Sequence, residues 1–169
     1  MLRLCIRCSS IEYIGLKKGS LVGFKGILGE LRWDTRTDKK KLVNDVTKVM
    51  SSKWIAHYNA NDYSGKWTSI ALMSKGGKSS NINAFSNSTE DFIATDILEF
   101  CSYFQEILDG FLFEKTAVRL LNLGSGAEIK PHTDYCLGYE DGVFRLHIPI
   151  ITNPDVTFIL DKQRLIMNV

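Results

Sequence analysis

Two stretches of the chain carry apolar residues at the spacing of an amphipathic helix. The first follows Asp38, which can cap a helix of about three turns; its apolar positions are Leu42, Val43, Val46, Val49 and Met50. In the second, Thr95 can act as the cap and Gly110 lies near the end; its apolar positions are Ile97, Phe100, Cys101, Phe104, Ile107, Leu108 and Phe111. The pattern therefore predicts two helices, each with one face packed on a core.

After residue 113 the apolar period changes from 3.6 to 2, which is typical of strands. The predicted strands, separated by Gly, Asp, Asn or Pro, are residues 116–123, 144–150, 156–160 and 164–169; an earlier strand is predicted at 67–73. Helices followed by strands with no helix between them exclude a βαβ sheet. The order favours an α+β, mainly β fold: an antiparallel barrel or double-sheet jelly roll with packed N-terminal helices.

Two segments follow neither period. Residues 1–30 contain short apolar runs interrupted by glycines and lysines, and we expect a poorly packed leader or a short β-extension there. Residues 76–88 are rich in Gly, Ser and Asn, which predicts a loop that is either functional or mobile. We therefore place one domain at residues 31–169 and assign no role to the leader at 1–30.

Composition and charge exclude several classes of protein. The chain has 169 residues and is 44% hydrophobic, which suits a single globular domain. Its net charge of +2 gives no electrostatic case for binding nucleic acid. No apolar run reaches the roughly 18 residues of a spanning helix, and the first residues form no secretory signal. We expect a cytoplasmic protein that binds neither nucleic acid nor membrane.

Cysteine spacing gives little support for a metal or redox site. Cys5 and Cys8 form a C-x-x-C pair, but Cys101 and Cys136 are isolated. A four-ligand zinc site would need a second pair. Reduced thiols are therefore the expectation.

His132 and Asp134 follow a predicted strand and are candidate metal ligands. On extended backbone, residues two apart point to the same side, so the imidazole and the carboxylate can face one point. Pro131 stiffens the approach to them. An H-x-D pair supplies two of the three ligands of the facial 2-His-1-carboxylate set that holds non-haem Fe(II). Taken alone, the motif is common by chance.

Arg145 and His147 stand in the next predicted strand. The period of 2 places both on one face and Leu146 on the opposite, apolar face. A buried arginine needs a partner, and a bound dicarboxylate would be one, because guanidinium binds carboxylate in a forked geometry. The alternative is a structural bridge from Arg145 to Asp134 or Glu128.

Three stretches carry a resemblance to a known family: WIAHYNANDYSGKWTSIAL (54–72), VRLLNLGSGAEIKPHTDY (118–135) and RLHIPIITNPDVTFIL (145–160). With them, residues 54–169 resemble the aspartyl/asparaginyl β-hydroxylase family, which is related to bacterial proline hydroxylases. The resemblance implies a cupin-like double-stranded β-helix and dependence on Fe(II) and 2-oxoglutarate. It also implies hydroxylation of an amino acid, or of an aspartyl, asparaginyl or prolyl residue in a peptide or protein substrate.

The resemblance also implies roles at the matched positions. His132 becomes the first iron ligand, and Asp134 becomes the carboxylate ligand, which some members of the family lack. Arg145 and His147 fall where the family contacts the carboxylates of 2-oxoglutarate.

The stretch at residues 54–72 contains polar and aromatic residues to which we give a structural or pocket-wall role: His57, Asn59, Tyr63 and Trp67. We do not expect His57 to be a third iron ligand.

The family's second iron histidine and a 2-oxoglutarate arginine lie on later strands, whereas no histidine follows His147 in this sequence. The expectation is therefore a chain shortened at its C-terminus, with an incomplete jelly roll, a missing third iron ligand and impaired activity.

Two functions of other classes also fit the residues. A non-catalytic β-barrel module would bind a small carboxylate or a protein partner without redox chemistry. A zinc hydrolase of cupin-like form would act without 2-oxoglutarate. Iron-dependent formation of succinate distinguishes the oxygenase from both.

Overall fold

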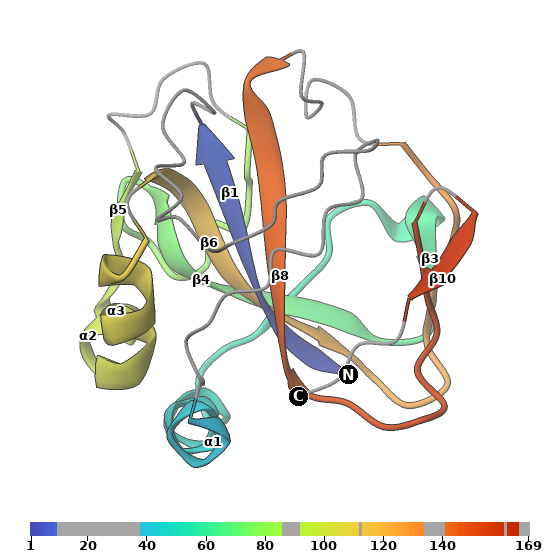
Figure 1. The fold of residues 1–169 in the computed structure, drawn as a ribbon, viewed down its shortest axis with the longest axis horizontal. Coiled ribbons are helices and arrows are strands. Elements are labelled where there is room, and N and C mark those ends of the chain that lie inside the picture. Colours follow the sequence, from blue (N-terminus) through green and yellow to red (C-terminus); the bar gives the residue numbers. More distant parts are fainter. Residues whose placement is uncertain (10–37, 86–91, 112, 134–140, 161, 166–169) are drawn as a thin grey trace, which may run out of the picture.

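The computed structural model describes residues 1–9, 38–85, 92–111, 113–133, 141–160 and 162–165 (Figure 1). Its strands are β1 (Leu2–Ser9), β2 (Ile55–Ala56), β3 (Tyr63–Ser64), β4 (Trp67–Lys75), β5 (Phe92–Ala94), β6 (Glu114–Leu123), β7 (Glu128–Ile129), β8 (Val143–Ile151), β9 (Phe158–Leu160) and β10 (Gln163–Leu165). Its helices are α1 (Lys39–Val49), the 3-10 helix η1 (Ala60–Asp62), α2 (Asp96–Glu99) and α3 (Ser102–Asp109).

Six strands form one sheet in the order β2-β4-β6-β1-β8, with β5 also paired to β4. Two small sheets, β3–β7 and β9–β10, have two strands each. All of these described pairs are antiparallel. The expectation of an α+β, mainly β fold is therefore confirmed, while the jelly roll stays a prediction.

The N-terminal strand β1 lies in the middle of the large sheet, between β6 and β8. Cys5 faces Arg119 on one side and His147 on the other. Of the two alternatives expected for the N-terminal segment, residues 2–9 thus form the β-strand and not the poorly packed leader, while residues 10–30 lie outside the described part of the chain. Their alternation of apolar and polar residues is a short period-2 pattern, in which Leu4 and Ile6 are 0% exposed.

The described α-helices pack against one face of the large sheet. In Figure 1, α1, α2 and α3 lie on one side of β1, β6 and β8, and β3 and β10 lie on the other. The main hydrophobic core joins Leu4 of β1, Leu120 of β6 and Ile150 of β8 to Val46 of α1 and Phe104 of α3. One face of the sheet thus packs on the main core, and the opposite face carries polar side chains together with a small apolar cluster around Ala117.

Helix α1 begins as the sequence predicts. The Asp38 carboxylate accepts hydrogen bonds from the backbone N–H groups of Lys40 and Lys41 at 2.9 and 3.2 Å. The helix ends with Lys48 in its last turn, where a positive charge is favourable.

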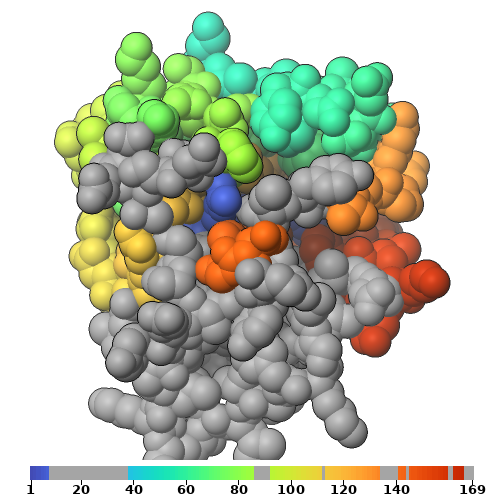
Figure 2. All heavy atoms as spheres, turned by 90° about the horizontal axis from the view of Figure 1, so that it is seen from above, coloured from blue at the N-terminus to red at the C-terminus, as the bar shows by residue number. Residues whose placement is uncertain are grey.

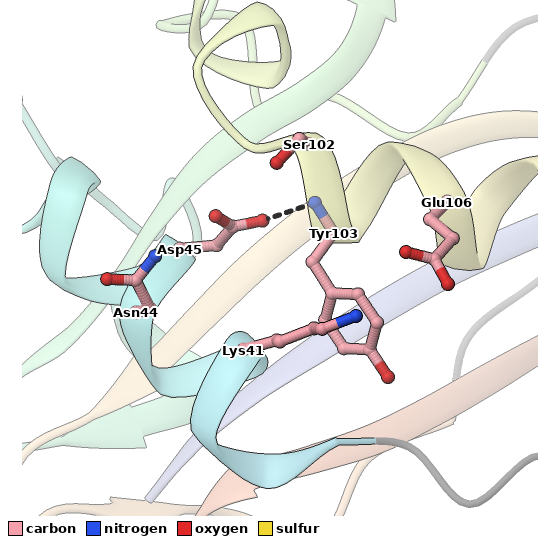
Figure 3. A pocket seen from close by; sticks show the side chains of 6 residues that line it. All are labelled: Lys41, Asn44, Asp45, Ser102, Tyr103 and Glu106. Atoms are coloured by element: carbon pink, nitrogen blue, oxygen red, sulfur yellow. Dashed lines mark hydrogen bonds between the residues drawn. The ribbon is translucent and has the colours of Figure 1, made fainter.

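The second predicted helix is divided into α2 and α3. The Thr95 hydroxyl does not cap it but donates to the Ala71 carbonyl at 2.9 Å. A new helix begins at Ser102, because the buried Asp45 carboxylate of α1 accepts from the N–H group of Tyr103 (Figure 3) and from that of Phe104. The division turns Phe100 to the solvent, where it is 66% exposed and not in the predicted face.

The remaining strands follow the predicted positions with shifted ends. The last predicted strand, 164–169, corresponds to β10 and the β9–β10 hairpin, and residues 166–169 lie outside the described part of the chain. Figure 2 shows from above that the segments around β3 (teal) and β7 (light orange) lie side by side at one edge of the molecule. Among the described helices, none has the length and apolar character needed to cross a bilayer.

Candidate functional site

The face of the large sheet opposite the described α-helices carries cationic and ionisable side chains from three neighbouring strands. In β8, Arg145 and His147 lie on this face, while Leu146 and Ile148 pack against the hydrophobic core. The predicted division of this strand into two faces is therefore observed. We call the resulting group the polar face; its members are Arg3, Cys5 and Arg7 of β1, Arg119 of β6, and Arg145 and His147 of β8.

Cys5 lies at the centre of the polar face and is 2% exposed. Burial alone would raise the pKa of its thiol, but the neighbouring His147, Arg119 and Arg145 outweigh burial and lower the pKa from 9.0 to about 6. Cys5 is therefore a thiolate at neutral pH, and its negative charge offsets part of the positive charge around it.

We expect the Cys5 thiol to titrate near pH 6 in the folded protein, measured by the ultraviolet absorbance of the thiolate. Because the pKa is lower in the folded chain, folding releases a proton between about pH 6 and 9, and the free energy of unfolding rises with pH across that window. Cys5→Ser is the control and should remove both the titration and its share of the pH dependence. An unchanged titration in Cys5→Ser would contradict the assignment.

The loop after β4 supplies backbone acceptors to two of the arginines. The Ile82 carbonyl accepts from Arg119 Nη1 at 2.9 Å, and the Ala84 carbonyl accepts from Arg7 Nη1. These contacts lie in the segment for which the sequence predicted a functional or mobile loop. Part of that segment therefore orients guanidinium groups on the polar face.

His57 belongs to an aromatic stack at the end of β2. Its ring lies parallel to the Trp67 ring at a centroid distance of 3.7 Å, and Tyr63 meets both rings edge-on. Burial, followed by the charge of Arg119, lowers the pKa of His57, so its imidazole is neutral at neutral pH. Its Nδ1 has no hydrogen-bond partner among the described residues.

His132 lies after β7, on exposed backbone that is tied to η1. Its Nδ1 lies 2.7 Å from the Lys130 carbonyl, and the backbone N–H of Lys130 donates to the Asp62 carbonyl at 2.7 Å. The charge of His132 contributes to lowering the pKa of His57, which places the two imidazoles within electrostatic range of each other. Asp134, the other predicted ligand, lies outside the described residues.

The contact made by His132 suits a metal ligand. A metal-binding histidine usually donates its second ring N–H to a carbonyl or carboxylate, which fixes the tautomer. With Nδ1–H directed at the Lys130 carbonyl, the lone pair is on Nε2. Within the described ranges, no group of three His, Cys, Asp or Glu side chains is placed to hold a metal. The role of His132 and Asp134 as iron ligands therefore stays a prediction.

Sequence reasoning does not identify Arg3, Cys5, Arg7 and Arg119 as members of the polar face. Arg119 was visible as a charge inside an apolar strand, VRLLNL, which is a pattern that indicates a buried polar face. Arg3 and Cys5 required recognition of β1 as a strand.

A separate hollow of about 270 Å³ lies between α1 and α3 (Figure 3). Its lining residues are Lys41, Asn44, Asp45, Ser102, Tyr103 and Glu106. It shares no residue with the polar face, and its most buried group, Asp45, is occupied in capping α3.

Fold and site together define a mainly antiparallel β protein in which one sheet face packs on helices and the other presents one imidazole and several guanidiniums, groups that suit anions. A family model described as Aspartyl/Asparaginyl beta-hydroxylase matches residues 36–168, most of the chain, and the protein belongs to this family. The resemblance seen in the sequence is thereby confirmed. No curated protein and no solved structure matches the chain.

Proposed function

We propose that the protein is a 2-oxoglutarate- and Fe(II)-dependent dioxygenase on a double-stranded β-helix. The substrate would be an amino acid, or an aspartyl, asparaginyl or prolyl residue of a peptide or protein. Membership of a hydroxylase family supports the reaction class. The observation that supports the proposal most directly is that Arg145 and His147, two positions apart on β8, share the polar face, where they would contact an acidic co-substrate.

His132, through Nε2, and Asp134 would hold the iron. When bound, Fe(II) supplies activation of O2, so that oxidative decarboxylation of 2-oxoglutarate to succinate and CO2 is coupled to hydroxylation of an unactivated C–H bond. The chain's contribution at His132 is a fixed tautomer, because the Lys130 carbonyl holds Nδ1 at 2.7 Å.

Arg145 and His147 would orient 2-oxoglutarate through its carboxylates. Arginine offers parallel N–H donors that match the two oxygens of a carboxylate. Their strand is held rigidly because β8 is paired with β1 along its length. Phe158 of β9 approaches the His147 ring at 6.0 Å and gives this part of the site an apolar neighbour. An apolar neighbour strengthens the charge-assisted contacts by excluding water.

Arg145→Ala is expected to weaken 2-oxoglutarate binding roughly 10- to 100-fold, the loss of a charge-assisted hydrogen bond. Iron binding should change little, because a guanidinium does not ligate a cation. Calorimetric titrations with each ligand measure the two effects. Arg145→Lys is the control variant, because it keeps the positive charge but lacks the two parallel N–H donors. Equal losses of iron and 2-oxoglutarate binding would instead assign Arg145 a structural role.

Formation of succinate tests the reaction class. The protein with Fe(II) and 2-oxoglutarate should produce succinate, and a chelator or Zn(II) in place of Fe(II) should abolish it. Binding of a carboxylate without any iron-dependent succinate would favour the non-catalytic module, and hydrolysis without 2-oxoglutarate would favour a zinc hydrolase.

A further inference from the structure

Strand β1 brings charged groups to the site from outside the part of the chain that the family model matches. The match covers residues 36–168, whereas β1 is Leu2–Ser9. Leu2, Leu4 and Ile6 are buried in the core, so the residues between them point to the polar face. Arg3 and Cys5 are the buried members of that second set, at 6% and 2% exposed.

Arg3 is a buried cation with spare hydrogen-bond donors. Nε and Nη1 have no partner within the described part of the chain, and the guanidinium carbon lies 5.2 Å from the centre of the Phe158 ring. Burial first, and then the charges of Arg145 and Arg119, lower the pKa of Arg3, whereas Cys5 raises it. A buried guanidinium with unmet donors is costly unless an anion binds it.

Two neighbouring side chains on the polar face, one of them the hydrogen-bond partner of Cys5, also have a buried nitrogen atom without a partner. Nε of Arg119 and Nδ1 of His147 also have no partner among the residues described. Both residues face Cys5 directly across the strand pairs, and Arg3 is two positions along β1 from Cys5. Side-chain nitrogen atoms from β1, β6 and β8 that have no hydrogen-bond partner among the described residues thus lie around Cys5.

We propose that Arg3, with Arg119 and His147, binds a carboxylate of a small dicarboxylate, so that the N-terminal strand forms part of the co-substrate site. This inference rests on the proposed function for the identity of the dicarboxylate as 2-oxoglutarate or its product succinate. The binding itself requires no iron, since every group in the site belongs to the chain.

The test measures binding of succinate to the metal-free protein, by the shift of the Tm in thermal unfolding and by calorimetric titration. Succinate should raise the Tm of the wild type and of Arg164→Met, an exposed β10 arginine that serves as the matched control. Arg3→Met should weaken succinate binding roughly tenfold or more, the value of a charge-assisted contact. Without ligand, Arg3→Met should be at least as stable as the wild type, because it removes a buried charge that lacks a bound anion.

A second measurement needs no variant. A carboxylate bound at Arg3 adds negative charge next to Cys5, so succinate should raise the pH at which the Cys5 thiol titrates, while acetate at equal concentration should shift it less. Wild-type succinate affinity in Arg3→Met, or no succinate effect on either the Tm or the Cys5 titration of the wild type, would overturn the inference. If a carboxylate of the chain itself neutralised Arg3, succinate would change neither the Tm nor the Cys5 titration of the wild type, and Arg3→Met would be less stable than the wild type.

The outcomes separate this inference from the proposed function. Arg3-dependent succinate binding without iron-dependent succinate formation would overturn only the oxygenase. Iron-dependent succinate formation that is unchanged in Arg3→Met would overturn only the role of Arg3.

Discussion

Asp45→Ala should lower the free energy of unfolding by about 3 kcal/mol, the range for leaving buried donors without their acceptor. Asp45 is 1% exposed and accepts from the N–H groups of Tyr103 and Phe104 at 2.8 and 3.1 Å. Loss of the carboxylate leaves the first turn of α3 uncapped inside the protein. For a chain of this size the expected drop in Tm is roughly 6 to 12 °C, measured by thermal or urea unfolding.

Two further variants separate the cap from the ion pair. Lys48 donates to the other Asp45 oxygen at 2.6 Å, but its side chain is 39% exposed. Lys48→Ala should therefore lower the free energy of unfolding by only a small fraction of the amount expected for Asp45→Ala. Asp45→Asn keeps an acceptor oxygen, so its loss in the free energy of unfolding should lie between those of Lys48→Ala and Asp45→Ala. If Lys48→Ala cost as much as Asp45→Ala, the ion pair and not the cap would hold α1 to α3.

His132→Ala should abolish Fe(II) binding, with a loss of at least roughly 100-fold in affinity, since even removal of an outer-shell partner costs 10- to 100-fold. Its Nδ1 is held by the Lys130 carbonyl, so Nε2 is the only ring nitrogen with a lone pair for the metal. Anaerobic calorimetry with Fe(II), or with Mn(II) as a stable substitute, measures the loss.

His57→Phe is the matched control for His132→Ala. Phe keeps a ring to stack on Trp67, whose centroid lies 3.7 Å from that of His57, and removes only the imidazole nitrogens. We expect this variant to bind Fe(II) as the wild type does. Normal metal affinity in His132→Ala, or its loss in His57→Phe, would assign the metal to a different histidine.

The features that could be predicted are those determined by neighbours in the sequence. The cap of α1 lies within three residues of the N–H groups it binds. The two faces of β8 follow from strict alternation, so the amino-acid pattern alone places Arg145 and His147 on one side of the strand.

The features that could not be predicted depend on distant partners. Strand β1 owes its central place to pairing with β6 and β8, more than 100 residues away along the chain. The division between α2 and α3 depends on Asp45, which is 58 positions from Tyr103 and lies on another helix. Because a periodicity window contains neither partner, the sequence pattern places neither Arg3 nor Cys5 in the site and assigns Phe100 to the core face.

The fate of isotopically labelled O2 tests the oxygenase assignment most directly. With Fe(II) and 2-oxoglutarate, mass spectrometry should find the label in succinate, and His132→Ala should form none. Succinate without label, or labelled succinate at an undiminished rate in His132→Ala, would contradict an iron site at His132 on this fold.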